Sequence, residues 1–227
     1  MIPVHVLSGD DAPERLVAIW ADAERLGIAI SRVGARSVEG LAPAERAVAV
    51  AENHRRAWTR IADGDAPFAA VLTDNVALGE PLLPLLSREF LARSLPPRSV
   101  LVLDAGAGLE EATGPARIVR PVAPPAGFRA YIISRVAVRQ LLAGDAASGP
   151  LDRVLARRRD HGIETFLVLP APVISEGGAE TGETDGANWA PSRVAAWGRN
   201  LMTRLAPRDS TLFEPIPVPT PEGGKPS

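Results

Sequence analysis

Residues 68–75 read Phe-Ala-Ala-Val-Leu-Thr-Asp-Asn, an apolar run that passes directly into polar residues. An apolar run of this length, preceded by Pro67, predicts a strand that is buried on both faces. Such strands are typical of parallel sheets covered by helices. Thr73, Asp74 and Asn75 would then follow the carboxyl end of the strand, where open α/β sheets bind their ligands.

The rest of the chain predicts strands that alternate with helices. Further strands are expected over residues 4–7, 28–33, 100–103, 117–120, 128–133 and 164–169. Helices are expected over 13–26, 43–62, 82–95, 134–142 and 150–160, the first of them after an aspartate cap and the fourth capped by Ser134. This alternation predicts an α/β fold whose mainly parallel sheet is flanked by helices on both faces.

The length of 227 residues fits one domain of ordinary size with a tail. Residues 1–205 are expected to form this single domain, ending in a helix over 189–205. Residues 175–186 contain little to bury and predict a mobile loop. Residues 206–227 are rich in proline and glycine and predict a disordered tail.

The composition excludes several classes of function. The chain has no cysteine, which excludes a disulfide framework, a thiolate metal site and a cysteine nucleophile. The net charge of −2 gives no basic field for nucleic acid. Lys225 is the only lysine and lies in the predicted tail, so no P-loop or Schiff-base lysine is expected.

The chain begins without a signal peptide and has no apolar run long enough to span a bilayer. These features favour a cytoplasmic protein and leave open a peripheral contact with the inner face of the membrane.

Four segments should meet at the carboxyl edge of the predicted sheet: Ser8–Asp11, Thr73–Asn75, Asp104–Gly108 and Gly127–Arg129. Asp74 and Asn75 would offer two oxygen ligands to a hard divalent cation and, through it, to a diphosphate. The alternative is that these residues form an Asx turn.

Several short motifs occur in a fixed order between residues 4 and 176. Residues 68–76 are similar to an "A-L-I-L-E-D-D-V" strand, and residues 53–58, Asn-His-Arg-Arg-Ala-Trp, to an "S-H-x-x-x-W" segment. Residues 131–134 and 150–152 are similar to "Y-x-I-S" and "P-V-D". In this order the motifs resemble glycosyltransferase family 25, the bacterial lipopolysaccharide glycosyltransferases, as a divergent member.

The resemblance implies a GT-A-like fold and an enzyme that transfers a hexose from a UDP-sugar to a lipopolysaccharide or cell-surface glycan acceptor. It also implies manganese or magnesium as a cofactor. Together with the strand-end argument it suggests metal ligands (Asp74, Asn75), catalytic residues (Asp152, His54) and donor-binding residues (Ser8, Gly9, Asp10, Arg15, Asp74, Arg129).

Departures from the family pattern keep other hypotheses open. The "E-D-D" is Thr-Asp-Asn here, the family's "G-C" is absent, and the spacing from Glu45 to His54 is longer. A degenerate member that binds a glycan or a protein without turnover is therefore the alternative. An unrelated nucleotide-binding α/β domain is a third hypothesis, although the chain lacks a G-x-G-x-x-G after its first strand.

Individual residues also have alternative roles. Arg15, Arg129 or Arg135 could replace the cation, because a guanidinium binds phosphate through two hydrogen bonds. His54 would share a helical face with Trp58 as a packed pair. Asp152 would cap the helix that follows Pro150.

Overall fold

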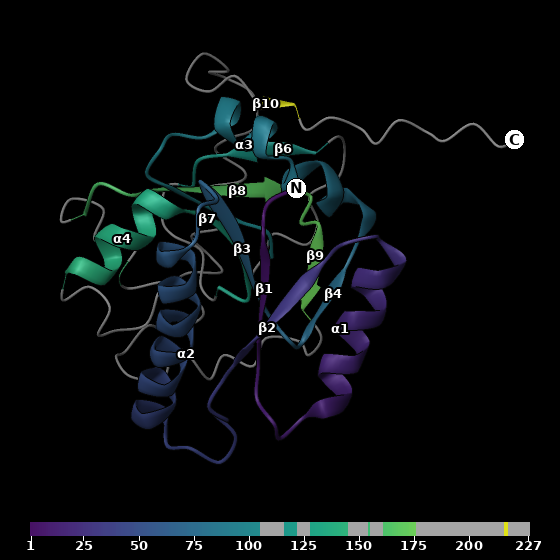
Figure 1. Cartoon of the computed structure of the whole chain (residues 1–227), viewed down its shortest axis with the longest axis vertical. Coiled ribbons are helices and arrows are strands. Elements are labelled where there is room, and N and C mark those ends of the chain that lie inside the picture. The colour runs from purple at the N-terminus through teal and green to yellow at the C-terminus, as the bar shows by residue number, and fades with distance from the viewer. Residues whose placement is uncertain (105–115, 122–127, 145–153, 155–160, 176–215, 218–227) are drawn as a thin grey trace, which may run out of the picture.

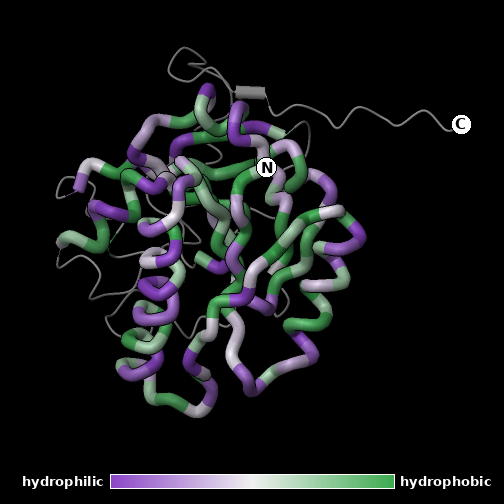
Figure 2. The backbone as a smooth tube through the Cα atoms, viewed as in Figure 1, coloured by the Kyte–Doolittle hydropathy of each residue, from purple (hydrophilic) through white to green (hydrophobic). Residues whose placement is uncertain are grey.

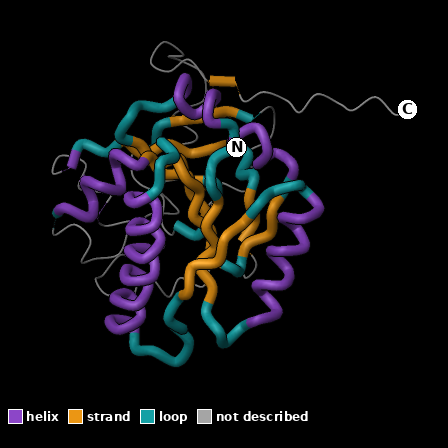
Figure 3. Tube along the Cα trace, in the orientation of Figure 1, coloured by secondary structure: helices purple, strands orange, loops and turns teal. Residues whose placement is uncertain are grey.

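A computed structural model describes residues 1–104, 116–121, 128–144, 154, 161–175 and 216–217. Its main sheet has eight strands: β1 (Val4–Ser8), β2 (Ile30–Gly34), β3 (Phe68–Thr73), β5 (Ser99–Val102), β6 (Arg117–Val119), β7 (Ala130–Ser134), β8 (Glu164–Leu169) and β10 (Ile216–Pro217). Their order across the sheet is β10-β6-β8-β5-β7-β3-β1-β2. Figures 1 and 3 show this sheet in the middle of the molecule.

Most strands of the main sheet run in one direction. The pairs β1–β2, β1–β3 and β5–β8 are parallel, whereas β7 is antiparallel to both β3 and β5, and β6 is antiparallel to both β8 and β10. Of the eight strands of the main sheet, only β6 and β7 are therefore reversed. The reversed β7 lies between β3 and β5, so its amino end lies beside their carboxyl ends.

Helices cover both faces of the sheet. The bounds are α1 (Pro13–Arg25), α2 (Pro43–Asp63), the 3₁₀ helix η1 (Glu80–Leu86), α3 (Arg88–Ser94) and α4 (Arg135–Ala143). One buried cluster joins α1, η1 and α3 to the sheet, and a second joins α2 and α4 to the other face. The predicted fold class, α/β with a mainly parallel sheet between two layers of helices, is confirmed.

The hydropathy pattern of each strand and helix explains this layering. Along β3, Phe68, Ala70 and Leu72 enter the α1 cluster while Ala69 and Val71 enter the α2 cluster. Successive side chains of a strand point to opposite faces, so a continuous apolar run can serve both cores. The helices instead alternate between hydrophobic and hydrophilic residues along their length, as α2 shows in Figure 2.

The predicted helix over 82–95 was wrong as one element. The segment divides into η1 and α3, with Pro84 inside η1 and Ser87 between the two helices. Proline has no N–H to donate within a helix, and the Ser87 hydroxyl accepts from the amide of Phe90 at 3.3 Å and starts a new helix.

Of the two predicted helix caps, one is confirmed and the other is wrong. Ser134 caps α4 as predicted, since its hydroxyl accepts from the amide of Ala137 at 3.1 Å. The aspartate cap predicted for α1 was wrong. Ala12 occupies the cap position without a side-chain hydrogen bond, although Pro13 does open the helix.

A second, two-stranded sheet was not predicted. It pairs β4 (Val76–Leu78) with β9 (Val173–Ser175), and only long-range pairing identifies such short strands. The side chains of Asp22 and Arg25 attach it to α1. The Asp22 carboxylate accepts from the Leu78 amide at 2.9 Å, and Arg25 donates to the Leu78 carbonyl at 3.0 Å.

The free edge of the main sheet at β2 is covered by arginines of α2. Arg60 donates to the carbonyl of Arg32 at 2.7 Å, and Arg56 donates to the carbonyl of Gly34 at 3.0 Å. Charged side chains at an edge strand oppose pairing with another chain. These bonds also hold α2 beside β2.

Several predicted elements lie wholly or partly outside the described residues. The predicted helix over 150–160 lies outside them except for Val154, which is helical and buried. The predicted helix over 189–205, most of the loop over 175–186 and all but two residues of the tail also lie outside them. Ile216 and Pro217 of that tail pair with β6 as β10. No helix among the described residues is long and apolar enough to cross a membrane.

A buried polar cluster joins α2 to β7. The Tyr131 hydroxyl accepts from the indole N–H of Trp58 at 3.0 Å and lies 2.9 Å from Nδ1 of His54. All three side chains are buried. Burial lowers the pKa of His54 to about 4, so the imidazole is neutral near pH 7.

Replacing Tyr131 by phenylalanine is expected to destabilise the fold. The Tyr131→Phe variant leaves the Trp58 N–H and the His54 ring without their partner, at a cost of about 2 kcal/mol. Urea unfolding measures this loss. The matched control is Thr59→Val, which removes an exposed hydroxyl from the same helix and should change stability by less than about 0.5 kcal/mol. Equal stability of both variants would contradict the role of the Tyr131 hydroxyl.

The pH dependence of stability should report the neutral His54. The unfolded chain takes up a proton near pH 6.5 and the folded chain only near pH 4, so this residue lowers stability as pH falls between these values. The full loss is on the order of 3 kcal/mol. Asp104, whose pKa burial raises to about 6, acts in the opposite direction.

Comparing the wild type with His54→Gln isolates the histidine, because Asp104 is common to both. The difference in unfolding free energy should shrink from pH 7 to pH 4.5. A difference that stays constant over this range would show that His54 is not held neutral.

Candidate functional site

The predicted strand-end segments meet at the carboxyl edge of the sheet where the structure describes them. The amide of Ala35 donates to the carbonyl of Ser8 at 3.0 Å, which joins the ends of β1 and β2. The amide of Asp74 donates to the carbonyl of Leu7 at 3.1 Å, which joins β3 to β1. These bonds make one continuous edge out of loops that are far apart in the sequence.

The start of β7 belongs to the same edge because this strand is reversed. The amide of Thr73 donates to the carbonyl of Arg129 at 2.7 Å, and the amide of Leu103 donates to the carbonyl of Ala130 at 2.9 Å. Arg129 therefore lies between the ends of β3 and β5. Of the four predicted segments, residues 105–108 and 127 lie outside the described part of the chain.

Asp74 is the half-buried carboxylate of this edge. Burial raises its pKa, whereas a hydrogen bond with the Ser8 hydroxyl and the charge of Arg15 act in the opposite direction. The Ser8 hydroxyl, itself buried, also lies 3.2 Å from the carbonyl of Gly9. Ser8, Arg15 and Asp74 thus form one polar group between the end of β1 and the first turn of α1.

Asp11 links this group to the end of β2. Its carboxylate accepts from the Ser37 hydroxyl at 2.5 Å. That hydrogen bond is the largest cause of its lowered pKa, and the charge of Arg15 also contributes. The positive charge of Arg15 thus favours the ionised form of both Asp11 and Asp74. Sequence analysis did not assign a role to Ser37.

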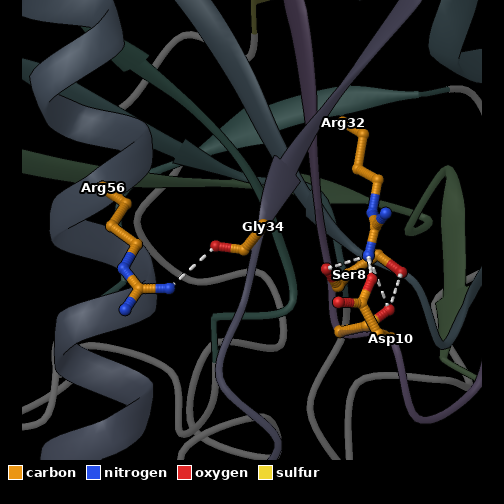
Figure 4. A network of polar contacts seen from close by, with 6 residues as sticks. Ser8, Asp10, Arg32, Gly34 and Arg56 are labelled. Carbon is orange, nitrogen blue, oxygen red and sulfur yellow. Dashed lines mark hydrogen bonds and ion pairs between the residues drawn. The ribbon is translucent and has the colours of Figure 1, made fainter.

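Arg32 supports the loop after β1, its side chain pointing toward Ser8 and Asp10 (Figure 4). Its guanidinium donates to the carbonyl of Gly9 at 2.9 Å and of Ser8 at 3.3 Å, and it forms an ion pair with Asp10. Asp10 is exposed and pairs with this arginine across the loop. Sequence analysis missed Arg32. The signal that could have identified Arg32 was its position in β2, the strand beside β1, two residues before β2 ends.

The predicted metal ligands Asp74 and Asn75 lie in the turn that follows β3. The amide oxygen of Asn75 accepts from the Thr73 hydroxyl at 2.6 Å, a bond between two side chains at the turn that follows β3. No group of three His, Asp or Glu side chains that could hold a metal ion occurs among the described residues.

His54 lies apart from the carboxylates of the edge. It is in the buried cluster with Tyr131 and Trp58, on the face of the sheet covered by α2. This arrangement corresponds to the packed-pair interpretation of His54. The second predicted catalytic residue, Asp152, lies outside the described residues.

Of the three arginines considered as cation substitutes, Arg15 and Arg129 lie toward the carboxyl edge and Arg135 does not. Arg135 begins α4, after the carboxyl end of the reversed β7, and therefore lies at the opposite edge of the sheet. There it donates to the carbonyl of Gly64 and lies 4.0 Å from Asp65.

Similar solved structures include several transferases. A glycosyltransferase involved in the glycosylation of the major capsid of PBCV-1 matches with a TM-score of 0.44 and 11% identity, over 89% of this chain and 99% of its own. The galactosyltransferase LgtC, in complex with donor and acceptor sugar analogs, matches with a TM-score of 0.42 and 12% identity, over 92% and 98%.

The inositol-1-phosphate CTP transferase from T. maritima matches with a TM-score of 0.40 and 8% identity, over 86% of this chain and 75% of its own. At these TM-scores and identities, the likenesses assign no activity, substrate or residue role to this chain. No protein-family model matches the sequence, and no curated protein matches it.

The support that Arg32 gives to the loop can be tested by hydrogen exchange. Arg32→Met removes the donors to Ser8 and Gly9, so the amides of residues 9–12 should exchange about tenfold faster, as the loss of a charged hydrogen bond implies. Arg56→Met is the matched control, because it removes a donor to the β2 carbonyl of Gly34 instead. Unchanged exchange over 9–12 in Arg32→Met would refute the anchoring role.

Proposed function

We propose that the protein binds the diphosphate of a nucleotide-sugar donor at the carboxyl edge of the sheet and transfers its hexose to a glycan acceptor. The observation that carries the proposal is the convergence of Ser8, Arg15, Asp74 and Arg129 from β1, α1, β3 and the start of β7. The ordered motifs that resemble glycosyltransferase family 25 support a UDP-sugar and a lipopolysaccharide or cell-surface acceptor.

The charges at the edge suit this chemistry. In hexosyl transfer the bond between the anomeric carbon and the diphosphate oxygen breaks, and the leaving nucleoside diphosphate takes the electron pair. The acceptor hydroxyl forms the new bond to the anomeric carbon and loses its proton to a base. Arg15 and Arg129 would stabilise the negative charge on the leaving group.

Asp74 would act on the uncharged part of the donor. Its carboxylate is oriented by the Ser8 hydroxyl and can accept hydrogen bonds from sugar hydroxyls. Asp152 is proposed as a catalytic residue on the family resemblance alone. No step here is routed through manganese or magnesium, because no group of three His, Asp or Glu side chains that could hold the ion occurs among the described residues.

The second candidate function is a glycan- or protein-binding module without turnover. The engagement of the Asn75 oxygen by Thr73 favours it, because a metal-dependent transferase would need that oxygen or further carboxylates for its ion. The two functions differ in whether the sugar is transferred and not in whether the edge is occupied.

Calorimetric titration of the full chain with UDP tests the binding step. UDP should bind at millimolar concentration or below, and Arg15→Gln should weaken binding about tenfold through the loss of one charge-assisted hydrogen bond. Arg93→Gln is the control. Arg93 lies in the last turn of α3, which leads into the amino end of β5 at the opposite edge, so binding should change less than twofold.

The same titrations with and without manganese test the predicted cofactor, and Asp74→Ala should abolish any effect of the ion. Release of UDP from a UDP-hexose in the presence of a lipopolysaccharide acceptor tests turnover, which Asp74→Ala should also abolish. UDP binding without any release would favour the binding module. Absence of UDP binding at millimolar concentration would overturn the proposal.

A further inference from the structure

Asp104 is a buried carboxylate at the end of β5 that the proposed reaction does not use. Only 6% of the residue is exposed. Its Oδ2 accepts from the amide of Arg129 and its Oδ1 from the amide of Ala130, both at 3.3 Å. Its backbone also forms an isolated parallel bridge to Val173, so Asp104 lies where β5, β7 and β9 meet.

These bonds hold Arg129 from one side, and β3 holds it from the other. The carbonyl of Arg129 accepts from the amide of Thr73 at 2.7 Å and lies 3.3 Å from the Thr73 hydroxyl. Both backbone polar groups of Arg129 are therefore paired. Its backbone is fixed at the edge, while its half-buried side chain carries the charge that the proposed diphosphate would meet.

Within the described part of the chain, one charged side chain acts on Asp104. Burial raises the pKa of its carboxyl group to about 6, against the two amide hydrogen bonds and the positive charge of Arg129. From β7 the facing charge is that of Arg129, and from β9 the facing residue is the apolar Val173. Among the described residues, Arg129 is the charged side chain that acts on this carboxylate.

We propose that Asp104 is a positioning residue for the donor diphosphate: it holds Arg129 at the edge and, through its own negative charge, sets how strongly Arg129 attracts an anion. This inference rests on the proposed function. When Asp104 is ionised, it partly neutralises Arg129. When Asp104 is neutral, the full charge of Arg129 acts on the diphosphate.

The linkage between proton binding by Asp104 and diphosphate binding gives the direction of the expected pH dependence. If the neutral form of Asp104 favours the bound diphosphate, binding must tighten as the pH falls through the range where this carboxyl takes up a proton. UDP-glucose is the suitable probe, because its diphosphate is a diester that does not titrate near neutral pH. Asp74, the other carboxyl at this edge with a raised pKa, is common to all the variants compared.

The experiment is calorimetric titration of the full chain with UDP-glucose at pH 7.5 and pH 5. In the wild type the dissociation constant should fall roughly fivefold at the lower pH, as expected for one charge acting across a partly solvated edge. In Asp104→Asn the fall should be clearly smaller, because only the contribution of Asp74 remains. Asp65→Asn, an exposed aspartate at the opposite edge, is the control and should keep the dependence of the wild type.

Nuclear magnetic resonance of the protein without ligand tests whether Asp104 titrates beside Arg129. The amide resonances of Arg129 and Ala130 should titrate together near pH 6 in the wild type and not in Asp104→Asn. If UDP-glucose binds and the wild type and Asp104→Asn share one pH dependence, the inference is overturned while the proposed function stands. If the amides do titrate but UDP-glucose does not bind at either pH, the proposed function fails and this role of Asp104 fails with it.

Discussion

The reversed strand β7, held between β3 and β5, is the constraint on which the rest of the structure depends. Parallel neighbours would present only carboxyl ends at this edge, whereas β7 brings its amino end there. The first amides of β7 need acceptors, because an unpaired buried N–H is costly. The carboxylate of Asp104 supplies them, and Thr73 binds the carbonyl of Arg129. One structural requirement thus places an arginine among the strand-end carboxylates.

The same strand also organises the face covered by α2. Tyr131 is one residue beyond Ala130, so its side chain points to the opposite face, where its hydroxyl binds Trp58 and His54. The helix α2 is in turn tied to β2 through Arg56 and Arg60. The candidate site and the packing of α2 are therefore parts of one arrangement, which is why His54 belongs to the core although it resembles a family motif.

Much of the candidate site could be predicted from residues that follow apolar strands. Ser8 and Asp74 were predicted on that basis, whereas Arg129 precedes its strand and lies at the same edge only because β7 is reversed. Arg32 and Ser37 could not be predicted in the same way, since their roles come from contacts with a loop more than twenty residues away. The same limit explains Asn75. Its residue type predicted an ion ligand, but its bond to Thr73 depends on the shape of the turn.

The sequence by itself determined the alternation of strands and helices, because apolar periodicity, proline at helix starts and the Ser134 cap act over a few residues. It also determined the exclusion of cysteine and lysine chemistry. Only the tertiary structure decided the reversed direction of β7, the pairing of β4 with β9 and the burial of Asp104. These features depend on hydrogen bonds between segments that are distant in the chain, where a short stretch of sequence carries no signal of its partner.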